Sequence, residues 1–600
     1  MGLLRRIKES LDPVLGFQIG FPVFMLTFFL IAPILMVLVA VTHYNFFGIF
    51  TDPTMFRIPS FDEFLKGFVK SGVLGKNTII RITGVSFGVV LNSLVTATVV
   101  TIVASILGII VAFVLARYTF PGKTIFRILA IVPLLMTPFI NSFVIRRMFH
   151  WNYGLLSWFV HDVMGIPIKI GVEEYVGVAL AQIITFYPII YLNVYASMMN
   201  IDPSLEEQAE NLGAKGFKLF RSVTLPLSLP GLAAGAAIVF IFSLEDVAGP
   251  IVFDRRDYIS YRILERFQSA YTGQMDPEAA ALSLILLMLA LSAFIVIKKY
   301  VSLRQYAMIS RGGRWTPRVR RPGIKGLLAI YLFVLPLILF TAFPQIGVFV
   351  FAFSQEWITS PIPQGFTLDH LAQIVADPAV RTAVINSLIY SSSALVLIII
   401  MGVSASYAIS RARIPGIGLL DVLVTMPIAL PGLVIAVGYF YFFTTFFRGT
   451  MLDPITYGPA LLLVFAYSVR RLPFTARAVF AGLQQLHIAL EESAMNLGAG
   501  RLRVLKDIVI PLIGLNILSG ALISFVYCMS EVSTSITLGG LGGIGAEHSA
   551  PITFIMKEYI ISPTGPYVVA ALGVLLISIQ LTVIIIINLV LKQRYAYIGV

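Results

Sequence analysis

Long apolar stretches separated by short polar segments recur along the whole chain. Runs such as Phe21–Val41, Leu94–Ala116, Leu282–Ile297 and Val569–Leu591 are long enough, alone or with their flanks, to cross a bilayer, which takes a helix of about 20 residues. A soluble core could not enclose so many runs of this length. The pattern therefore predicts an all-α polytopic membrane protein.

Twelve membrane spans are expected from this pattern. They lie near 17–42, 86–116, 128–148, 174–199, 231–253, 279–298, 326–352, 383–410, 417–446, 457–478, 513–538 and 566–591. The segment Lys298–Lys325, rich in basic residues, reads as a cytoplasmic linker between two halves of six spans, residues 1–310 and 311–600. Composition agrees, because 58% of residues are apolar and 12% charged, against about 25% charged in soluble domains.

The two halves repeat each other in sequence. Asn92-Ser93-Leu94 near the start of the second span recurs as Asn386-Ser387-Leu388, 294 residues later, and Arg117 recurs as Arg411 at the same offset. Later in the halves the offset is 285. Because both halves would begin on the cytoplasmic side, the repeat is parallel, with a pseudo-two-fold axis along the membrane normal. A translocation path on that axis is the natural inference.

The distribution of basic residues explains the formal charge of +13. Lys and Arg gather between spans at every second connection, as the positive-inside rule expects of cytoplasmic loops. The exceptions, on a segment placed outside, are Lys66, Lys70, Lys76 and Arg81. We therefore expect membrane lipid and not nucleic acid as a partner, with both termini cytoplasmic.

A short motif between the fourth and fifth spans recurs between the tenth and eleventh. The first copy reads Leu-Glu-Glu-Gln-Ala-Glu-Asn-Leu-Gly over 205–213 and the second Leu-Glu-Glu-Ser-Ala-Met-Asn-Leu-Gly over 490–498, each followed after nine residues by a four-residue segment ending in proline. Residues 204–212 suit a short amphipathic helix with Ser204 as N-cap, ended by Gly213 at positive φ. Pro226 then fits the start of the next span. An ordinary amphipathic loop is the alternative, and two copies with one spacing argue against it.

The pattern Glu-x-Ala-x-x-x-Gly-x9-(Ile/Val)-x-(Leu/Ile)-Pro resembles the EAA loop of permeases from ATP-binding cassette importers, with Gln208 and Ser493 in place of the usual middle alanine. The resemblance implies the type I importer permease fold and a loop that docks in a groove of the ATP-binding subunit. It also implies which residues couple ATP hydrolysis to transport. These are Glu207, Ala209, Gly213 and Pro226 in the first half, and Glu492, Ala494, Gly498 and Pro511 in the second.

The segment Tyr467–Phe474, with Gln485 downstream, is similar to the lead-in of this loop in fused, two-half permeases of the ferric-iron type. The resemblance implies two ATP-binding cassette subunits, an extracytoplasmic solute-binding protein and the bacterial inner membrane. Ferric iron is the expected solute. Ser530–Thr534 departs from the Glu-Leu-Pro-Ala-Thr stretch associated with iron permeases, so phosphorylated sugars, phosphonates and polyamines stay open.

A nucleotide site of the chain's own is not expected. Gly122-Lys123-Thr124 looks like the end of a P-loop, but Arg117 stands where the first glycine must be. We therefore expect a transport subunit and not an enzyme, without cofactor or resident metal, with ATP used by the partner subunit. The alternative is a proton- or ion-coupled secondary transporter of twelve spans, as in the major facilitator family. The loop between the second and third spans of that family carries a Gly…Asp-Arg…Gly-Arg signature, but segment 117–127 contains no acidic residue.

Three carboxylates fall within predicted spans, Glu245 and Asp246 in the fifth and Glu531 in the eleventh. A charge at mid-membrane costs roughly 2.5–3.5 kcal/mol on insertion scales, so such groups face protein or water. Asp246 and Glu531 coincide at the 285-residue offset. They are candidates for an acidic station on the solute path. The alternative is a structural pair satisfied by serines such as Ser243 and Ser530.

Arginines at span ends have a simpler expectation. Arg146, Arg147, Arg470 and Arg471 are expected to extend to lipid headgroups or to pair with helix C-termini.

Overall fold

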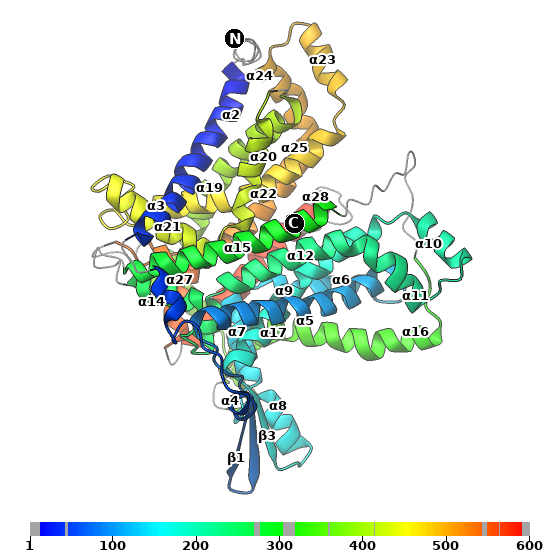
Figure 1. The fold of residues 1–600 in the computed structure, drawn as a ribbon, viewed down its shortest axis with the longest axis vertical. Helices are drawn as coiled ribbons and strands as arrows, with labels where there is room; N and C mark the ends of the chain where they lie inside the picture. The colour runs from blue at the N-terminus through cyan, green and yellow to red at the C-terminus, as the bar shows by residue number, and fades with distance from the viewer. Residues whose placement is uncertain are drawn as a thin grey trace.

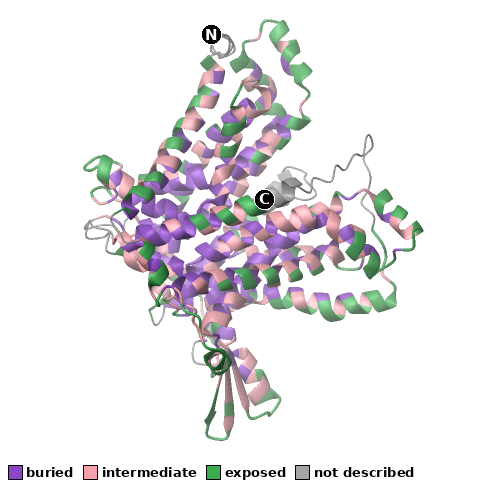
Figure 2. Cartoon of the chain, viewed as in Figure 1, coloured by how far each residue is buried: buried purple, intermediate pink, exposed green. Residues whose placement is uncertain are grey.

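The computed structural model describes residues 13–42, 46–268, 276–303, 319–357, 360–412, 414–542, 549–562 and 565–590. The predicted cytoplasmic termini and the boundary between residues 310 and 311 lie outside this part of the chain. Its helices form two groups that diverge from a common region (Figure 1). Buried residues concentrate where the two groups meet, and exposed residues mark their far ends (Figure 2).

The long helices and the short helices that carry the repeated motifs follow the same order in the two halves, which confirms the predicted repeat. The first half contains α2 Pro13–Leu26, η1 Thr27–Ile31, α3 Ala32–Val41, α5 Val89–Arg117, α6 Lys123–Ile131, η3 Val132–Leu135, α7 Pro138–Met148, α9 Glu174–Met199, α10 Pro203–Asn211, α11 Phe217–Leu219, η5 Phe220–Thr224, α12 Leu225–Glu245, α13 Ala248–Val252, α14 Ile259–Phe267 and α15 Pro277–Leu303. The second half contains α16 Ile324–Ala329, η7 Ile330–Val334, α17 Leu335–Phe353, α19 Pro378–Arg411, α20 Ile417–Thr425, η8 Met426–Ala429, α21 Gly432–Phe446, α22 Ala460–Gln485, α23 Ile488–Asn496, α24 Arg501–Val504, η9 Leu505–Val509, α25 Ile510–Met529, α26 Ser533–Leu538, α27 Ile552–Ile560 and α28 Gly565–Val590.

Within the described residues, nine helices are long and apolar enough to cross a membrane, and two bent pairs raise the number to eleven. The bent pairs correspond to the third and ninth predicted spans, which turn by 102° and 107°. Pro133 and Pro427 lie in the 3-10 turns that lead into the two bends, where a missing N–H and a ring clash disturb the helix. The tenth predicted span corresponds to α22, a helix of 26 residues that contains two consecutive arginines.

Prolines inside four membrane helices are accommodated by π-helical turns. Each turn ends two residues before its proline, and the pairs are η1 with Pro33, η5 with Pro226, η7 with Pro336 and η9 with Pro511. At η5, the N–H of Leu225 donates to the carbonyl of Phe220, five residues back. The hydrogen-bond register of the helix therefore shifts by one residue just before Pro226, which cannot donate. The prediction that Pro226 starts a span is therefore wrong, because the helix runs unbroken over Phe217–Glu245.

The first helices of the two halves interlock the molecule. The helix α3 packs on α15 of its own half and on α21 of the other, and α2 packs on α19 and α20. In the equivalent way, α17 packs on α28 of its own half and on α6 and α7 of the first. Each half therefore completes its packing with a helix from the other.

A small sheet projects from the region where the helix groups meet, away from α10 and α23 (Figure 1). Strand β2 Asn77–Ile82 pairs antiparallel with β1 Val69–Leu74 and parallel with β3 Ile168–Val172. Two short helical elements accompany it, α4 Phe61–Phe68 and α8 Leu155–Trp158. We call β1, β2 and β3 the outer sheet.

One helix crossing in each half depends on a glycine at an equivalent position. A Cβ at Gly108 of α5 would lie 2.6 Å from Ile190 Cγ2 and 2.9 Å from the backbone nitrogen of Tyr191. At the equivalent Gly402 of α19, the nearest atom is Thr475 Cγ2 at 3.2 Å. The first crossing is therefore the less tolerant of the two.

We expect Gly108→Ala to lower the stability of the purified protein by about 1–3 kcal/mol through overpacking, and Gly402→Ala to lower it less. Thermal denaturation in detergent measures both. Gly418→Ala is the control, since a Cβ there meets nothing within 4 Å. Equal denaturation temperatures for all three variants would contradict the packing argument.

Candidate coupling surfaces and solute path

The two repeated motifs form short helices at the far ends of the two helix groups (Figure 1). Asp202 caps α10 and accepts a hydrogen bond from the Ser204 N–H at 2.9 Å. The predicted N-cap, Ser204, is therefore wrong by two residues, because Pro203 occupies the first helical position, where its fixed φ is already helical. His487 caps α23 in the same way.

Both helices end in the same hydrogen-bonded turn. Gly213 has φ +86° and Gly498 has φ +90°, as the sequence predicts. The N–H of Ala214 donates to Ala209 O at 2.9 Å, and that of Gly213 donates to Glu210 O at 2.9 Å. The second half repeats both bonds within 0.1 Å, from Ala499 to Ala494 and from Gly498 to Met495. This is a Schellman ending, which needs a residue tolerant of positive φ.

A buried ion pair anchors each short helix to the rest of its half. Glu206 is 3% exposed, and its Oε1 accepts from Arg117 Nη2 and Thr224 Oγ1, both at 2.8 Å. The contact joins α10 to the end of α5 and to η5. In the second half, Glu491 accepts from Arg411 Nε at 2.8 Å and from the Tyr407 hydroxyl at 2.9 Å.

These anchors escaped the sequence analysis although their signal was present. Arg117 and Arg411 match at one offset, and Glu206 and Glu491 match at the other. The shared recurrence of both pairs was the clue that the arginine and the carboxylate touch.

The first short helix has a further contact with the segment that joins the halves. Arg320 forms an ion pair with Glu210, and its backbone pairs with Arg117 and Thr119 at 2.8 and 2.9 Å. An apolar cavity of about 410 Å³ lies between this contact and α5. The residue equivalent to Glu210 is Met495, so the ion pair belongs to the first half alone.

The outer faces of α10 and α23 are left open. Glu207 and Glu492 are exposed, and the leucines before the terminal glycines, Leu212 and Leu497, are 88% and 90% exposed. Exposed apolar side chains in a matched position mark a surface that suits a protein partner.

The three predicted carboxylates lie at breaks between helices and not inside continuous spans. Glu245 ends α12, Asp246 follows it, and Glu531 lies between α25 and α26. Asp246 accepts from the N–H groups of Ala248 and Gly249 at 3.1 and 3.2 Å. Glu531 accepts in the same way from two N–H groups at the start of α26, at 3.0 and 3.2 Å. Asp246 and Glu531 thus each accept hydrogen bonds from backbone N–H groups of the short helix that follows.

The side-chain partners of these carboxylates differ between the halves. Asp246 accepts from the amide of Gln182 at 2.9 Å. Glu531 instead forms an ion pair with Arg470, whose other nitrogen lies 3.1 Å from Glu245. Arg470 is 5% exposed, so the expectation that it extends to headgroups is wrong. It pairs with carboxylates from both halves because they converge on one buried position.

A cavity of about 110 Å³ adjoins this charged cluster. Both halves line it, with Thr185, Phe242 and Asp246 from the first and Tyr527 and Ser533 from the second. The Gly432 N–H, at the start of α21, donates to Glu245 at 2.7 Å. The predicted path residues are therefore brought together where the halves meet, with Arg470 as the member that sequence reasoning assigned elsewhere.

Comparisons with known proteins agree on one family. The model of the family described as "Binding-protein-dependent transport system inner membrane component" matches residues 104–304 and 398–596. The ferric transport system permease protein FbpB of Actinobacillus pleuropneumoniae is 27% identical over 538 residues, 88% of this chain and 75% of that protein. The putative ferric transport system permease protein FbpB 1 of Haemophilus influenzae is 27% identical over 493 residues, 80% of this chain and 75% of that protein.

One solved structure is also similar to part of the chain. It is a bacterial ABC transporter involved in the import of the acidic polysaccharide alginate, 18% identical, with a TM-score of 0.33. The match covers 46% of this chain and all of that one.

We expect Glu491→Gln to loosen α23 from α19, because the Arg411 guanidinium then stays half-buried without its carboxylate. Removing one partner of a buried ion pair costs about 3–5 kcal/mol. Limited proteolysis of the purified protein measures this as faster cleavage within residues 488–500. Glu492→Gln, on the exposed face of the same helix, is the matched control and should cleave at the wild-type rate. Identical cleavage of both variants would argue against the anchor.

Proposed function

The chain belongs to the binding-protein-dependent transport system inner membrane components, the permeases of ATP-binding cassette importers, and from that premise we propose that it imports ferric iron. The observation that carries the proposal is the match to a ferric transport permease over 88% of this chain. The family match in both halves leaves the alternative of a secondary transporter without support.

We propose that one ATP-binding subunit docks on each of α10 and α23. Four matched features support two equivalent docking sites: the capped start, the Schellman ending, the buried anchor and the exposed leucine. In this arrangement Glu207 and Glu492 face the ATPase, while Ala209, Ala494 and the two glycines close the helix ends. The chain is then a transport subunit without catalytic residues or a cofactor of its own, and ATP is hydrolysed by its partners.

The motion of each docked helix would pass to the earlier span that is anchored to it and to the span that follows it in the chain. The anchors connect α10 to α5 and η5, and α23 to α19. The prolines of the motif, Pro226 and Pro511, lie just after the π turns of those following helices. A π turn is a common place for a helix to bend. We therefore assign the two prolines to the transmitting helices and not to the docking face.

This assignment sets the orientation in the bacterial inner membrane. The ends that carry α10 and α23 face the cytoplasm, with both termini on that side, and the outer sheet faces the solute-binding protein. We divide the chain into a first permease half, 1–310, and a second, 311–600.

We further propose that Glu245, Asp246 and Glu531 form a station on the solute path. Carboxylate oxygens are the ligands that hard cations prefer, and here they converge from both halves beside a cavity. Arg470 neutralises two of them in this state. A passing cation would therefore compete with Arg470, while Asp246 is held by a neutral amide and is the readiest acceptor.

We expect Gly213→Pro together with Gly498→Pro to abolish ATP-driven transport while leaving membrane insertion intact. Proline fixes φ near −65° and cannot adopt the φ of either glycine or donate the closing N–H. The measurement is uptake into vesicles supplied with ATP, with proton gradients collapsed. Gly500→Ala is the control, since Gly500 has φ −68° and open space around it. Wild-type uptake in the double variant would remove these helices from coupling.

We expect Asp246→Asn to reduce uptake of radiolabelled ferric iron about tenfold, equivalent to about 1.4 kcal/mol. The amide keeps the size of the side chain but loses its charge. Asp246→Asn with Glu531→Gln should reduce uptake further, because both carboxylates of the symmetric pair are then lost. Uptake by Asp246→Asn at the wild-type rate would show that Asp246 is not on the solute path. If the wild type takes up no ferric iron, the proposal that iron is the solute is wrong.

A further inference from the structure

The outer sheet accounts for the basic residues that departed from the positive-inside pattern. Most of them are neutralised by ion pairs, and these are Lys66–Asp62 at 2.7 Å, Lys70–Glu174 at 2.8 Å and Arg81–Glu173 at 3.9 Å. Lys76, at the β1–β2 turn, makes no ion pair with the residues that the structure describes. Of these four basic residues, Lys76 is therefore the one without a carboxylate partner among the described residues, and it lies at the tip of the sheet.

The tip of the sheet also exposes apolar side chains. Val73 and Leu74 are 78% and 57% exposed. On the neighbouring π turn Phe159–Val163, Phe159 is 52% exposed. Apolar residues beside a free lysine suit a protein surface that offers apolar contacts and a carboxylate.

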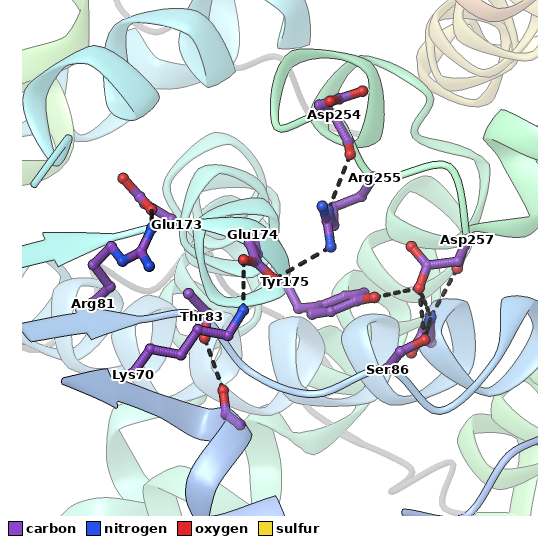
Figure 3. Close-up of polar contacts among 12 residues, drawn as sticks. Lys70, Arg81, Thr83, Ser86, Glu173, Glu174, Tyr175, Asp254, Arg255 and Asp257 are labelled. Atoms are coloured by element: carbon purple, nitrogen blue, oxygen red, sulfur yellow. Dashed lines mark hydrogen bonds and ion pairs between the residues drawn. The ribbon is translucent and has the colours of Figure 1, made fainter. Parts of the chain in front are cut away.

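The loop Phe253–Tyr258 between α13 and α14 presents alternate residues to two sides. Asp254 and Arg256 line a cavity of about 610 Å³ between the halves, whose far wall includes Lys557 of α27. Arg255 and Asp257 contact the other side, toward α9 and the outer sheet (Figure 3). One loop is therefore both a wall of the outer cavity and a neighbour of the sheet.

Glu174 connects the sheet to this loop. Its Oε1 lies 2.8 Å from Lys70 Nζ of β1, and its Oε2 lies 3.2 Å from Arg255 Nη1 (Figure 3). Asp257 holds the other end of the loop, where it accepts from Ser86 Oγ at 2.6 Å and from Asn92 Nδ2 at 2.9 Å. Loop, helix and sheet are thus joined through one carboxylate.

The adjacent carboxylate does not provide an equivalent link. Glu173 lies 3.9 Å from Arg81 and 3.9 Å from His150. Burial, reinforced by neighbouring arginines, lowers the pKa of His150 to about 4, so this imidazole is neutral near pH 7. Burial likewise raises the pKa of Glu173. The short contacts to charged partners belong to Glu174.

Backbone strain coincides with this connection. Among the described residues, only two non-glycine residues have positive φ, Glu174 at +50° and Asp254 at +52°. Such conformations cost free energy and persist where surrounding contacts hold them. Both lie within the connection, one in the bridging carboxylate and one beside its partner Arg255. Release of the contacts would let the loop relax.

The second half lacks this arrangement. At the 285-residue offset, Glu174 corresponds to Pro459. The following loop is longer in the second half, and beyond it Ile259 and Ile552 make equivalent hydrogen bonds to Ser93 and Ser387. Asp257 therefore corresponds to Ala550. The charged connection to an outer sheet is therefore a property of the first half.

We propose that the outer sheet is the docking surface for the solute-binding protein, and that Glu174 transmits docking to the loop 253–258, which is the outer gate. The proposal rests on the assignment of the chain as an importer permease. Contact at the sheet tip moves β1 and Lys70 leaves Glu174. The strained backbone at Glu174, with φ +50°, then relaxes, and its carboxylate moves away from Arg255. The loop then relaxes and opens the cavity between the halves to the arriving solute.

The gate is tested on the whole transporter, permease with its ATPase subunits, reconstituted in nanodiscs with the binding protein that supports wild-type uptake. We expect Glu174→Gln to keep the basal ATPase rate and the affinity for the binding protein, but to lose at least severalfold of the stimulation that this protein causes. Lys70→Gln and Arg255→Gln should each have the same effect. The double variant should lose no more stimulation than either single variant, because both residues act through Glu174. Asp62→Asn, which breaks the exposed pair with Lys66, is the matched control.

A second measurement follows opening without the partner. Lys557 is 8% exposed on the far wall of the cavity, and Cys528 is the one cysteine in the chain. In a Cys528→Ala background, we expect Lys557→Cys to react severalfold faster with an impermeant maleimide when Glu174→Gln is added. An unchanged labelling rate overturns the gate.

The docking surface is tested separately at the sheet tip. Val73→Asp with Lys76→Glu should weaken capture of the binding protein at least severalfold and leave basal ATPase unchanged. Unchanged capture, or altered attachment to lipid vesicles instead, overturns docking at the sheet. Stimulation of Glu174→Gln equal to that of wild type overturns transmission while the importer assignment stands. If no binding protein stimulates the ATPase rate of the wild type, the importer assignment fails. The labelling rate of Lys557→Cys still tests whether the loop 253–258 is a gate.

Discussion

The rest of this structure depends on one constraint: inside a bilayer, every backbone N–H and C=O needs a partner from the protein itself. Each interruption of a helix therefore has to come with its own acceptors and donors. Asp246 and Glu531 supply acceptors for the first N–H groups of α13 and α26. The π turns supply shifted bonds where prolines cannot donate. The first of these devices places two carboxylates beside the cavity that both halves line.

The molecule is symmetric at the ends that carry α10 and α23 and asymmetric at the end that carries the outer sheet. The two short helices share cap, ending and anchor, as expected of sites that meet two copies of one subunit. At the other end, the outer sheet and the charged loop belong to the first half, and the equivalent loop of the second half is glycine-rich. The proposed function explains this difference, since the halves would then meet identical ATPase subunits on one side of the membrane and a single binding protein on the other.

The sequence was sufficient for features that depend on local pattern or on recurrence. The presence of many long apolar helices, the parallel repeat and the positive φ of Gly213 and Gly498 followed from apolar length, from offsets and from the steric freedom of glycine. It was insufficient where the outcome depends on what lies next to a residue in space. Arg470 looked like a span-end arginine, and only the convergence of two carboxylates shows it as a buried counter-ion. Pro226 looked like a helix start, because hydropathy does not show that a π turn lets the helix continue.

The exchange of first helices between the halves has a consequence for biogenesis. The helix α3 packs on α21, which leaves the ribosome long after it. At roughly 5–20 residues per second of synthesis, α3 waits in the bilayer for tens of seconds before its surface is covered. During that interval the nascent first half is an incomplete bundle, exposed to membrane quality control. Fusion of the halves into one polypeptide shortens the wait from a chance encounter of two chains to the time of one translation.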